Sequence, residues 1–235
     1  MKLILILLIF ITLFSGCIDN NIPVVQSNTS INITNNITQS TTGITSNITT
    51  QQTRAYFLHD DNSTGLPYTS KDMRLAFDPG EPLEFTNYSN IPNGNTTIQN
   101  FTSPIMNISF VPHGIHTLHL HALKIGSGGS HVLKLFYDCG TVNSTGYNLS
   151  IKGTSEFSPE ISSVLHTEVD LDMMMPDENI NLTDRMFVRI WSNQVGSGNL
   201  PNLQLQYDDL TDSRLEFPIL NTFEYQNGLL KSITS

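Results

Sequence analysis

Four histidines fall within nine residues of this sequence, at His113, His116, His119 and His121. Residues two apart in a strand share one face and lie about 6.5–7 Å apart along the chain, so His119 and His121 can reach one ion. Asp138 is the carboxylate expected beside His119 on the neighbouring strand. Imidazole and carboxylate ligands are typical of open zinc sites. The pattern predicts a His-bound transition metal at His119, His121 and Asp138, but it also fits a solvated sheet face.

A second group could bind sugars. Trp191, Phe187 and Arg189 alternate along one predicted strand and share its outward face, and Phe136 lies on an outward face of another. Saccharides are held by flat aromatic faces together with a few polar groups. These four residues therefore predict a ligand-binding surface for carbohydrate. The alternative is that residues 217–230 cover Phe187 and Trp191 as a second layer of core.

Carboxylates supply a third candidate, a structural calcium ion. Residues 60–65 partly resemble an oxygen-ligand loop, but Lys71 stands where the closing acidic residue of an EF-hand would be. Glu168, Asp170 and Asp172 form an acidic row on one predicted strand. Both features also fit ordinary polar surface.

Catalysis is not expected from the motifs. The sequence contains no Gly-x-Ser-x-Gly elbow and no phosphate-binding glycine loop. Cys139 has Asp138 and Gly140 beside it, neither of which would activate a thiol, so it is expected to be a small buried side chain. With 11 basic and 21 acidic residues and a net charge of −10, nucleic acid is excluded as a partner. The sequence predicts a protein that is not an enzyme.

Strands must position these side chains. Short alternating runs between Gly, Pro, Asn and Asp clusters predict an all-β, antiparallel sandwich. The expected strands span residues 55–59, 73–77, 83–86, 105–111, 115–125, 131–138, 147–151, 163–173, 186–192, 203–207 and 214–217.

The clearest predicted hairpin joins residues 115–125 to 131–138 through a glycine-rich loop. Side-chain alternation favours the register that pairs Gly126 with His131. That register places Leu118, Leu120 and Ala122 opposite Tyr137, Leu135 and Leu133, and His119 beside Asp138.

The first 16 residues predict a signal peptide. Lys2 precedes an apolar run over residues 3–14, which is shorter than the about 20 residues of a membrane-spanning helix. The run ends in Ser15-Gly16-Cys17 and resembles the lipobox of prokaryotic lipoproteins. The resemblance implies that Cys17 is lipidated and anchors the chain to the membrane.

Residues 17–53 are expected to be a disordered stalk, followed by a β-sandwich domain over residues 54–235. Residues 20–53 contain no charged residue and no aromatic residue. Such a segment buries too little apolar surface to offset its ordering entropy.

Asn, Thr and Ser together number 71 of the 235 residues, and twelve glycosylation motifs occur among them. The asparagines predicted to carry glycans are Asn28, Asn32, Asn36, Asn47, Asn62, Asn87, Asn95, Asn100, Asn107, Asn143, Asn148 and Asn181. A lipobox combined with dense motifs of this kind is similar to archaeal cell-surface lipoproteins.

The second half resembles the jelly-roll sandwiches of secreted prokaryotic proteins, including carbohydrate-binding modules. The matching stretches are residues 167–171, 181–190, 203–209 and 213–215. The resemblance implies a jelly-roll-like fold.

The expected function is a binding or structural module of the cell envelope. It would stand on the outer face of the membrane and recognise polysaccharide or a surface-layer partner. The alternative is a metal-binding protein or metal-dependent envelope enzyme that uses His119, His121 and Asp138.

Overall fold

The computed structural model describes residues 33–40, 43–62, 70–75, 84–126, 130–207, 213–226 and 229–233. Every regular element in these ranges is a strand, which confirms the predicted all-β fold class. No helix in this part of the chain is long and apolar enough to span a membrane. The predicted signal peptide and Cys17 lie outside the described residues.

The strands in the described ranges follow one another closely. They are β1 (Ile33–Ser40), β2 (Gly43–Asn62), β3 (Lys71–Arg74), β4 (Glu84–Tyr88), β5 (Gly94–Ile105), β6 (Phe110–Val111), β7 (Gly114–Ile125), β8 (Ser130–Val142), β9 (Ser150–Thr154), β10 (Thr167–Met175), β11 (Glu178–Asn179), β12 (Arg185–Ser197), β13 (Asn202–Tyr207), β14 (Arg214–Gln226) and β15 (Leu229–Ile233).

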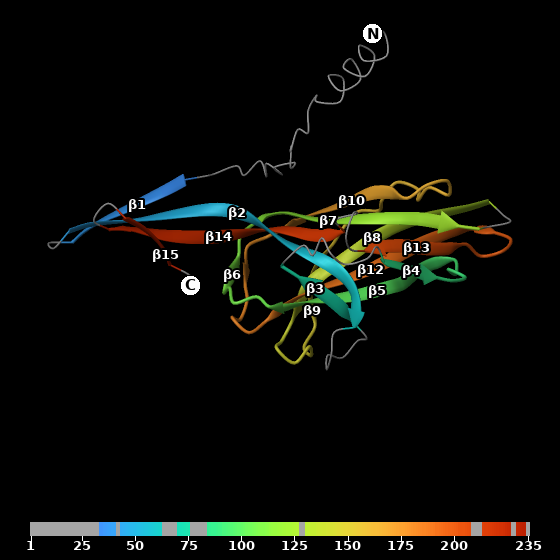
Figure 1. The fold of residues 1–235 in the computed structure, drawn as a ribbon, viewed down its shortest axis with the longest axis horizontal. Coiled ribbons are helices and arrows are strands. Elements are labelled where there is room, and N and C mark those ends of the chain that lie inside the picture. Colours follow the sequence, from blue (N-terminus) through green and yellow to red (C-terminus); the bar gives the residue numbers. More distant parts are fainter. Residues whose placement is uncertain are drawn as a thin grey trace, which may run out of the picture.

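One 13-stranded sheet folds over into two layers (Figure 1). The first layer contains β4, β13, β7 and β10, together with β14 and β2. The second layer is β5-β12-β8-β9. β3 joins them, because it pairs antiparallel with β2 and parallel with β5. The architecture is therefore a β-sandwich whose two layers are joined through β3.

Alternating side chains of both layers meet in the core. Leu118 and Leu120 of β7 face inward, as do Leu133 and Leu135 of β8, and all four are fully buried. The ring of Phe101 in β5 packs edge-on against that of Tyr207 in β13, with centroids 5.5 Å apart. Burial of one such side chain contributes roughly 1.5–3 kcal/mol, so these contacts hold the layers together.

The predicted hairpin between β7 and β8 is wrong. β7 pairs with β10 on one edge and with β13 and β14 on the other. β8 pairs instead with β12 and β9. The chain crosses from one layer to the other after Gly126, whose φ is 47°. The apolar faces were predicted correctly, but they meet across the core rather than side by side in one sheet.

Four strands extend beyond the sandwich as an arm, seen on the left of Figure 1. We define the arm as residues 33–40, 43–53, 220–226 and 229–233, with the strand order β1-β2-β14-β15. β2 and β14 each run without interruption from the sandwich into the arm. The expected domain boundary at residue 54 therefore falls inside β2.

The prediction of disorder is wrong for the part of residues 17–53 that the structure describes. Residues 33–40 and 43–53 are paired strands. Polar side chains meet across the ladder: the Thr49 and Thr222 hydroxyl oxygens lie 3.4 Å apart, and the Asn221 amide donates to Gln52. The prediction considered only apolar burial, whereas main-chain hydrogen bonds form whatever the side chains are.

Candidate functional site

A groove of about 570 Å³ lies where β9 of the second layer approaches β10 of the first. The close approach depends on Gly153, because a Cβ there would lie 2.5 Å from the Met173 sulfur. The groove is lined by Ile115, Thr154, Glu156, Phe157, Asp170, Leu171, Asp172, Met173 and Met174. Its volume is within the range of sites for small ligands.

Phe157 is the aromatic side chain of this groove, with 53% of its surface exposed. Its ring packs edge-on against Phe136 at 5.0 Å between centroids, and Phe136 stacks in parallel on Trp191 at 5.9 Å. The Trp191 Nε1 donates a 2.7 Å hydrogen bond to Asp138 Oδ2, which fixes the indole. The three rings therefore form a continuous aromatic stack that ends at the groove.

The four residues predicted to bind a ligand do gather on the outer face of the second layer. The Arg189 guanidinium lies 5.4 Å from the Phe187 ring centroid and 5.6 Å from that of Trp191. Phe187 is fully buried and Phe136 is 8% exposed, while Trp191 is half-buried. Phe187 and Phe136 therefore lie mainly beneath this surface and leave little of their own area exposed.

The alternative, that residues 217–230 cover Phe187 and Trp191, does not hold for Phe217. Phe217 faces the core, where its ring stacks on Tyr56 with centroids 5.6 Å apart.

Phe157 was not among the residues predicted from the sequence, because it follows β9 in a loop, where no strand alternation assigns a face.

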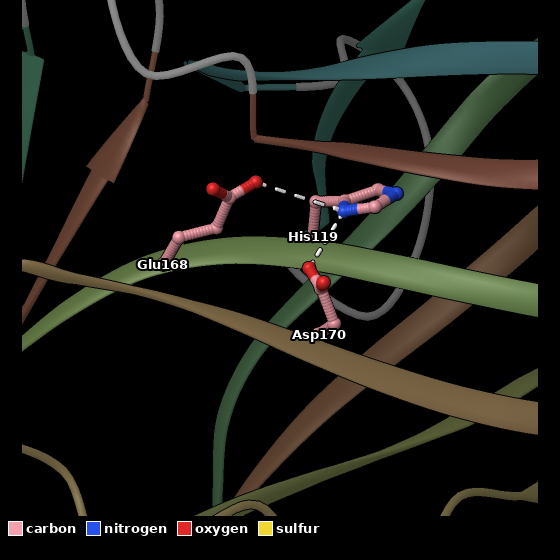
Figure 2. A group of neighbouring side chains, drawn as sticks. All are labelled: His119, Glu168 and Asp170. Carbon is pink, nitrogen blue, oxygen red and sulfur yellow. Dashed lines mark hydrogen bonds and ion pairs between the residues drawn. The ribbon is translucent and has the colours of Figure 1, made fainter.

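A second cluster lies on the outer face of the first layer. Figure 2 shows His119 of β7 with Glu168 and Asp170 of β10 pointing toward one another. His119 Nδ1 is 2.7 Å from Asp170 Oδ1 and 3.8 Å from Glu168 Oε1. One ligand atom from each residue lies within 4.8 Å of the others, so the group can hold a metal ion.

The ring of His119 has a third acidic neighbour. Its Nε2 lies 3.8 Å from Glu216 Oε2, and Glu216 also accepts a 2.6 Å hydrogen bond from Arg214 Nε. The His119 side chain is only 14% exposed. At 3.8 Å the Glu216 carboxylate does not hydrogen-bond to the imidazole, and His119 Nε2 has no hydrogen-bond partner among the described residues.

The predicted ligand set is thus wrong in part. Asp138 lies on β8 in the second layer, where it binds Trp191 and accepts a 2.7 Å hydrogen bond from the Thr154 hydroxyl. The register places His119 opposite Asp170, and His121 opposite Glu168. His121 shares the outward face of His119 but does not belong to the three-residue group.

The predicted calcium features are engaged in protein contacts. Asp60 forms an ion pair with Lys71, and Asp61 forms one with Arg74. Asp172 accepts a 2.6 Å hydrogen bond from the Thr117 hydroxyl. Of the acidic row, Glu168 and Asp170 belong to the His119 cluster.

Cys139 is a free, fully buried cysteine, as predicted. Burial raises the pKa of its thiol to about 12. A thiol in this environment is protonated near neutral pH, which disfavours a nucleophilic role.

Seven of the asparagines predicted to carry glycans lie on the surface. Exposed or half-buried positions are Asn87, Asn95, Asn100, Asn107, Asn143, Asn148 and Asn181. Asn36 and Asn47 face each other in the β1–β2 pair of the arm, and Asn62 ends β2. Asn28 and Asn32 lie outside the described residues.

Comparisons with known proteins identify the fold only. No family model matches the sequence, and no curated protein matches it significantly. Two crystal structures of a CocE/NonD family hydrolase from Staphylococcus aureus are similar, with TM-scores of 0.52 and 0.51 and identities of 10% and 9%.

The match covers 73% and 72% of this chain but 37% of the hydrolase in each case. An aminopeptidase from a Thaumarchaeota archaeon matches at a TM-score of 0.45 and 7% identity, over 72% of this chain and 36% of that one. At 10% and 9% identity the similarity to the hydrolase describes the fold alone, and the chain spans little more than a third of the hydrolase's length.

Proposed function

We propose that this chain is a non-catalytic binding module of the cell envelope that holds a neutral saccharide in the groove between β9 and β10. The observation that carries the proposal is Phe157, an exposed ring beside carboxylate and hydroxyl groups in a groove of about 570 Å³. Aromatic faces with a few polar groups are the usual means of holding a sugar ring. The Phe136–Trp191 stack beneath it would keep the ring in place.

The charge of the groove selects among saccharides. Glu156, Asp170 and Asp172 line it, and the whole chain carries a net charge of −10. Carboxylates accept hydrogen bonds from sugar hydroxyls and repel uronic acids and phosphorylated sugars. A neutral polysaccharide is therefore the proposed ligand.

The N-terminal sequence supports a surface location for this module. A lipidated Cys17 would anchor the chain to the outer face of the membrane, and glycans on the asparagine motifs would cover the surface outside the groove. A surface-layer protein is the other partner that such a location allows.

Calorimetric titration of the full chain with neutral oligosaccharides tests the proposal. Phe157→Ala should weaken binding about tenfold, because one aromatic contact contributes roughly 0.5–1.5 kcal/mol. Tyr147→Ala is the matched control, since Tyr147 is an exposed aromatic that does not line the groove. An equal loss in both variants, or no binding of any neutral saccharide by the wild type, would contradict the proposal.

The His119 cluster supports a second candidate function, the binding of a divalent transition metal. His119, Glu168 and Asp170 would be its ligands, and the Glu216 carboxylate, 3.8 Å from His119 Nε2, adds negative charge beside the cluster. One imidazole with carboxylates suits Zn²⁺ better than the all-oxygen sites of Ca²⁺. No reaction is assigned to the metal.

Titration of the full chain with Zn²⁺ tests this second function. His119→Gln should reduce the affinity by more than about 100-fold, which exceeds the effect of losing an outer-shell partner. Asp138→Asn is the control, because Asp138 lies in the other layer and should leave Zn²⁺ binding unchanged. Loss of binding in Asp138→Asn would instead restore the ligand set predicted from the sequence.

A further inference from the structure

One histidine in the core of the sandwich belongs to neither of the sites described above. His116 of β7 is fully buried, and neither of its ring nitrogens has a hydrogen-bond partner among the described residues. Its ring contacts that of Phe217 at 5.7 Å. A buried polar group without a partner is rare in native structures and often marks a bound ion or water.

Two sulfur atoms lie next to each other in the same region. The Cys139 thiol of β8 is 3.4 Å from the Met186 thioether sulfur of β12. Both side chains are buried. A metal–sulfur bond measures about 2.3 Å, so two sulfurs bound to one ion lie roughly 3.5–4 Å apart. The observed separation is close to that spacing.

The histidine and the sulfur pair line one small cavity. Its volume is about 10 Å³, and its lining includes His116, Cys139, Met175 and Met186. That volume accommodates about one water-sized sphere. Lys152 and Glu178, which pair at 2.9 Å and are partly exposed, also line it and mark its side nearest to solvent. The cavity therefore has the size of a single ion and is lined by sulfur and imidazole ligands from both layers.

We propose that this cavity binds one Cu(I) ion through the Cys139 sulfur, the His116 imidazole and the Met186 thioether, with Met175 as a fourth contact. Thiolate and thioether ligands select Cu(I) over hard cations, and imidazole also suits copper. The ion replaces the thiol proton: the S–H bond breaks, an S–Cu bond forms, and one proton leaves to solvent. No electron is transferred. The proposal is independent of saccharide and Zn²⁺ binding on the outer faces.

The electrostatics of the cavity agree with this ligand set. Burial lowers the pKa of His116 to about 4, so the imidazole is neutral near pH 7 and has a free lone pair. A monovalent ion paired with one thiolate leaves no net charge in the core, which keeps the desolvation cost low.

Anaerobic titration of the full chain with Cu(I), buffered by a chromophoric chelator, tests the proposal. All variants carry Cys17→Ser, so that Cys139 is the remaining cysteine of the chain. We expect one Cu(I) per chain and the release of one proton, read from the dependence of the binding enthalpy on the buffer. Cys139→Ser should weaken binding by about 100-fold or more, and Met186→Leu by about tenfold.

Met186→Leu nearly conserves volume and should remain folded, which thermal unfolding of each variant verifies. Met174→Leu is the control, because Met174 is exposed beside the buried Met175 on β10. A folded Cys17→Ser chain that takes up no Cu(I) would overturn the proposal. Equal Cu(I) affinity in the Cys17→Ser chain and in its folded Met186→Leu and Cys139→Ser derivatives would also overturn it.

Discussion

The arm and the sandwich are built from the same strands but are stabilised differently. β14 runs through both: Leu215 and Phe217 are fully buried in the sandwich, whereas Leu220, Asn221 and Thr222 in the arm are exposed or half-buried. In the sandwich, apolar side chains from two layers exclude water. In the arm, the described contacts are main-chain ladders and polar side-chain pairs. The comparison shows that a strand can continue well beyond the core that stabilises it.

Hydrogen exchange within β14 and β2 should give the largest contrast. We expect amides of residues 55–58 and 214–217 to exchange only by global unfolding, at about 5–15 kcal/mol, and those of residues 48–53 and 220–223 by local opening at a few kcal/mol. The comparison stays within two continuous strands, so sequence-local effects are shared. Equal protection along β14 would mean that the arm and the sandwich unfold as one unit.

Leu120→Ala tests the core of the sandwich. Leu120 is fully buried in β7, and truncation should lower the free energy of unfolding by about 3 kcal/mol through lost burial and a cavity. Chemical denaturation measures the change. Val164→Ala, at a highly exposed position, should change stability by less than about 0.5 kcal/mol.

Tyr137→Phe tests a single polar contact between the layers. The Tyr137 hydroxyl on β8 donates a 2.9 Å hydrogen bond to the main-chain oxygen of His116 on β7. Its removal leaves a buried acceptor without this partner and should cost about 1–2 kcal/mol. Tyr147→Phe at an exposed position should cost nothing measurable; a similar loss in both would refute a specific role for the contact.

Thr222→Ala should have the smallest effect. Thr222 lies in the arm, and its hydroxyl is 3.4 Å from that of Thr49 across the ladder. Because the pair is partly solvated, we expect a change below about 0.5 kcal/mol in global stability and a local rise in exchange rates near residue 222. A loss as large as that of Leu120→Ala would show that the arm contributes to the global fold.

Alternation in the sequence was sufficient to predict which side chains face the core. The apolar faces predicted for residues 115–125 and 131–138 are buried: Leu118, Leu120 and Ala122 on β7, and Leu133, Leu135 and Tyr137 on β8. The pattern was insufficient where polar residues form strands: β5 is rich in Asn and Thr and was not predicted, although it pairs with β12 over most of its length. The strand predicted over residues 163–173 begins only at Thr167, so Leu165 lies outside it and is exposed.

The candidate sites depend on strand pairing, which alternation does not specify. His119 was identified from its neighbours along the chain, but its carboxylate partners come from β10, 49 and 51 residues away. Phe157 and Trp191 became one cluster only because β8 lies between β12 and the loop after β9.

The sequence by itself determined the all-β class, the inward faces of the central strands and the burial of Cys139. These follow from local periodicity and from the apolar character of single residues. Only the tertiary structure decided that β7 and β8 lie in different layers, that Asp138 is separated from His119, and that the polar residues 33–40 and 43–53 extend the sheet. Those features depend on which strands pair across long distances in the sequence. Alternation does not specify this pairing, because the hydrogen bonds between strands are made by the main chain and are independent of side-chain identity.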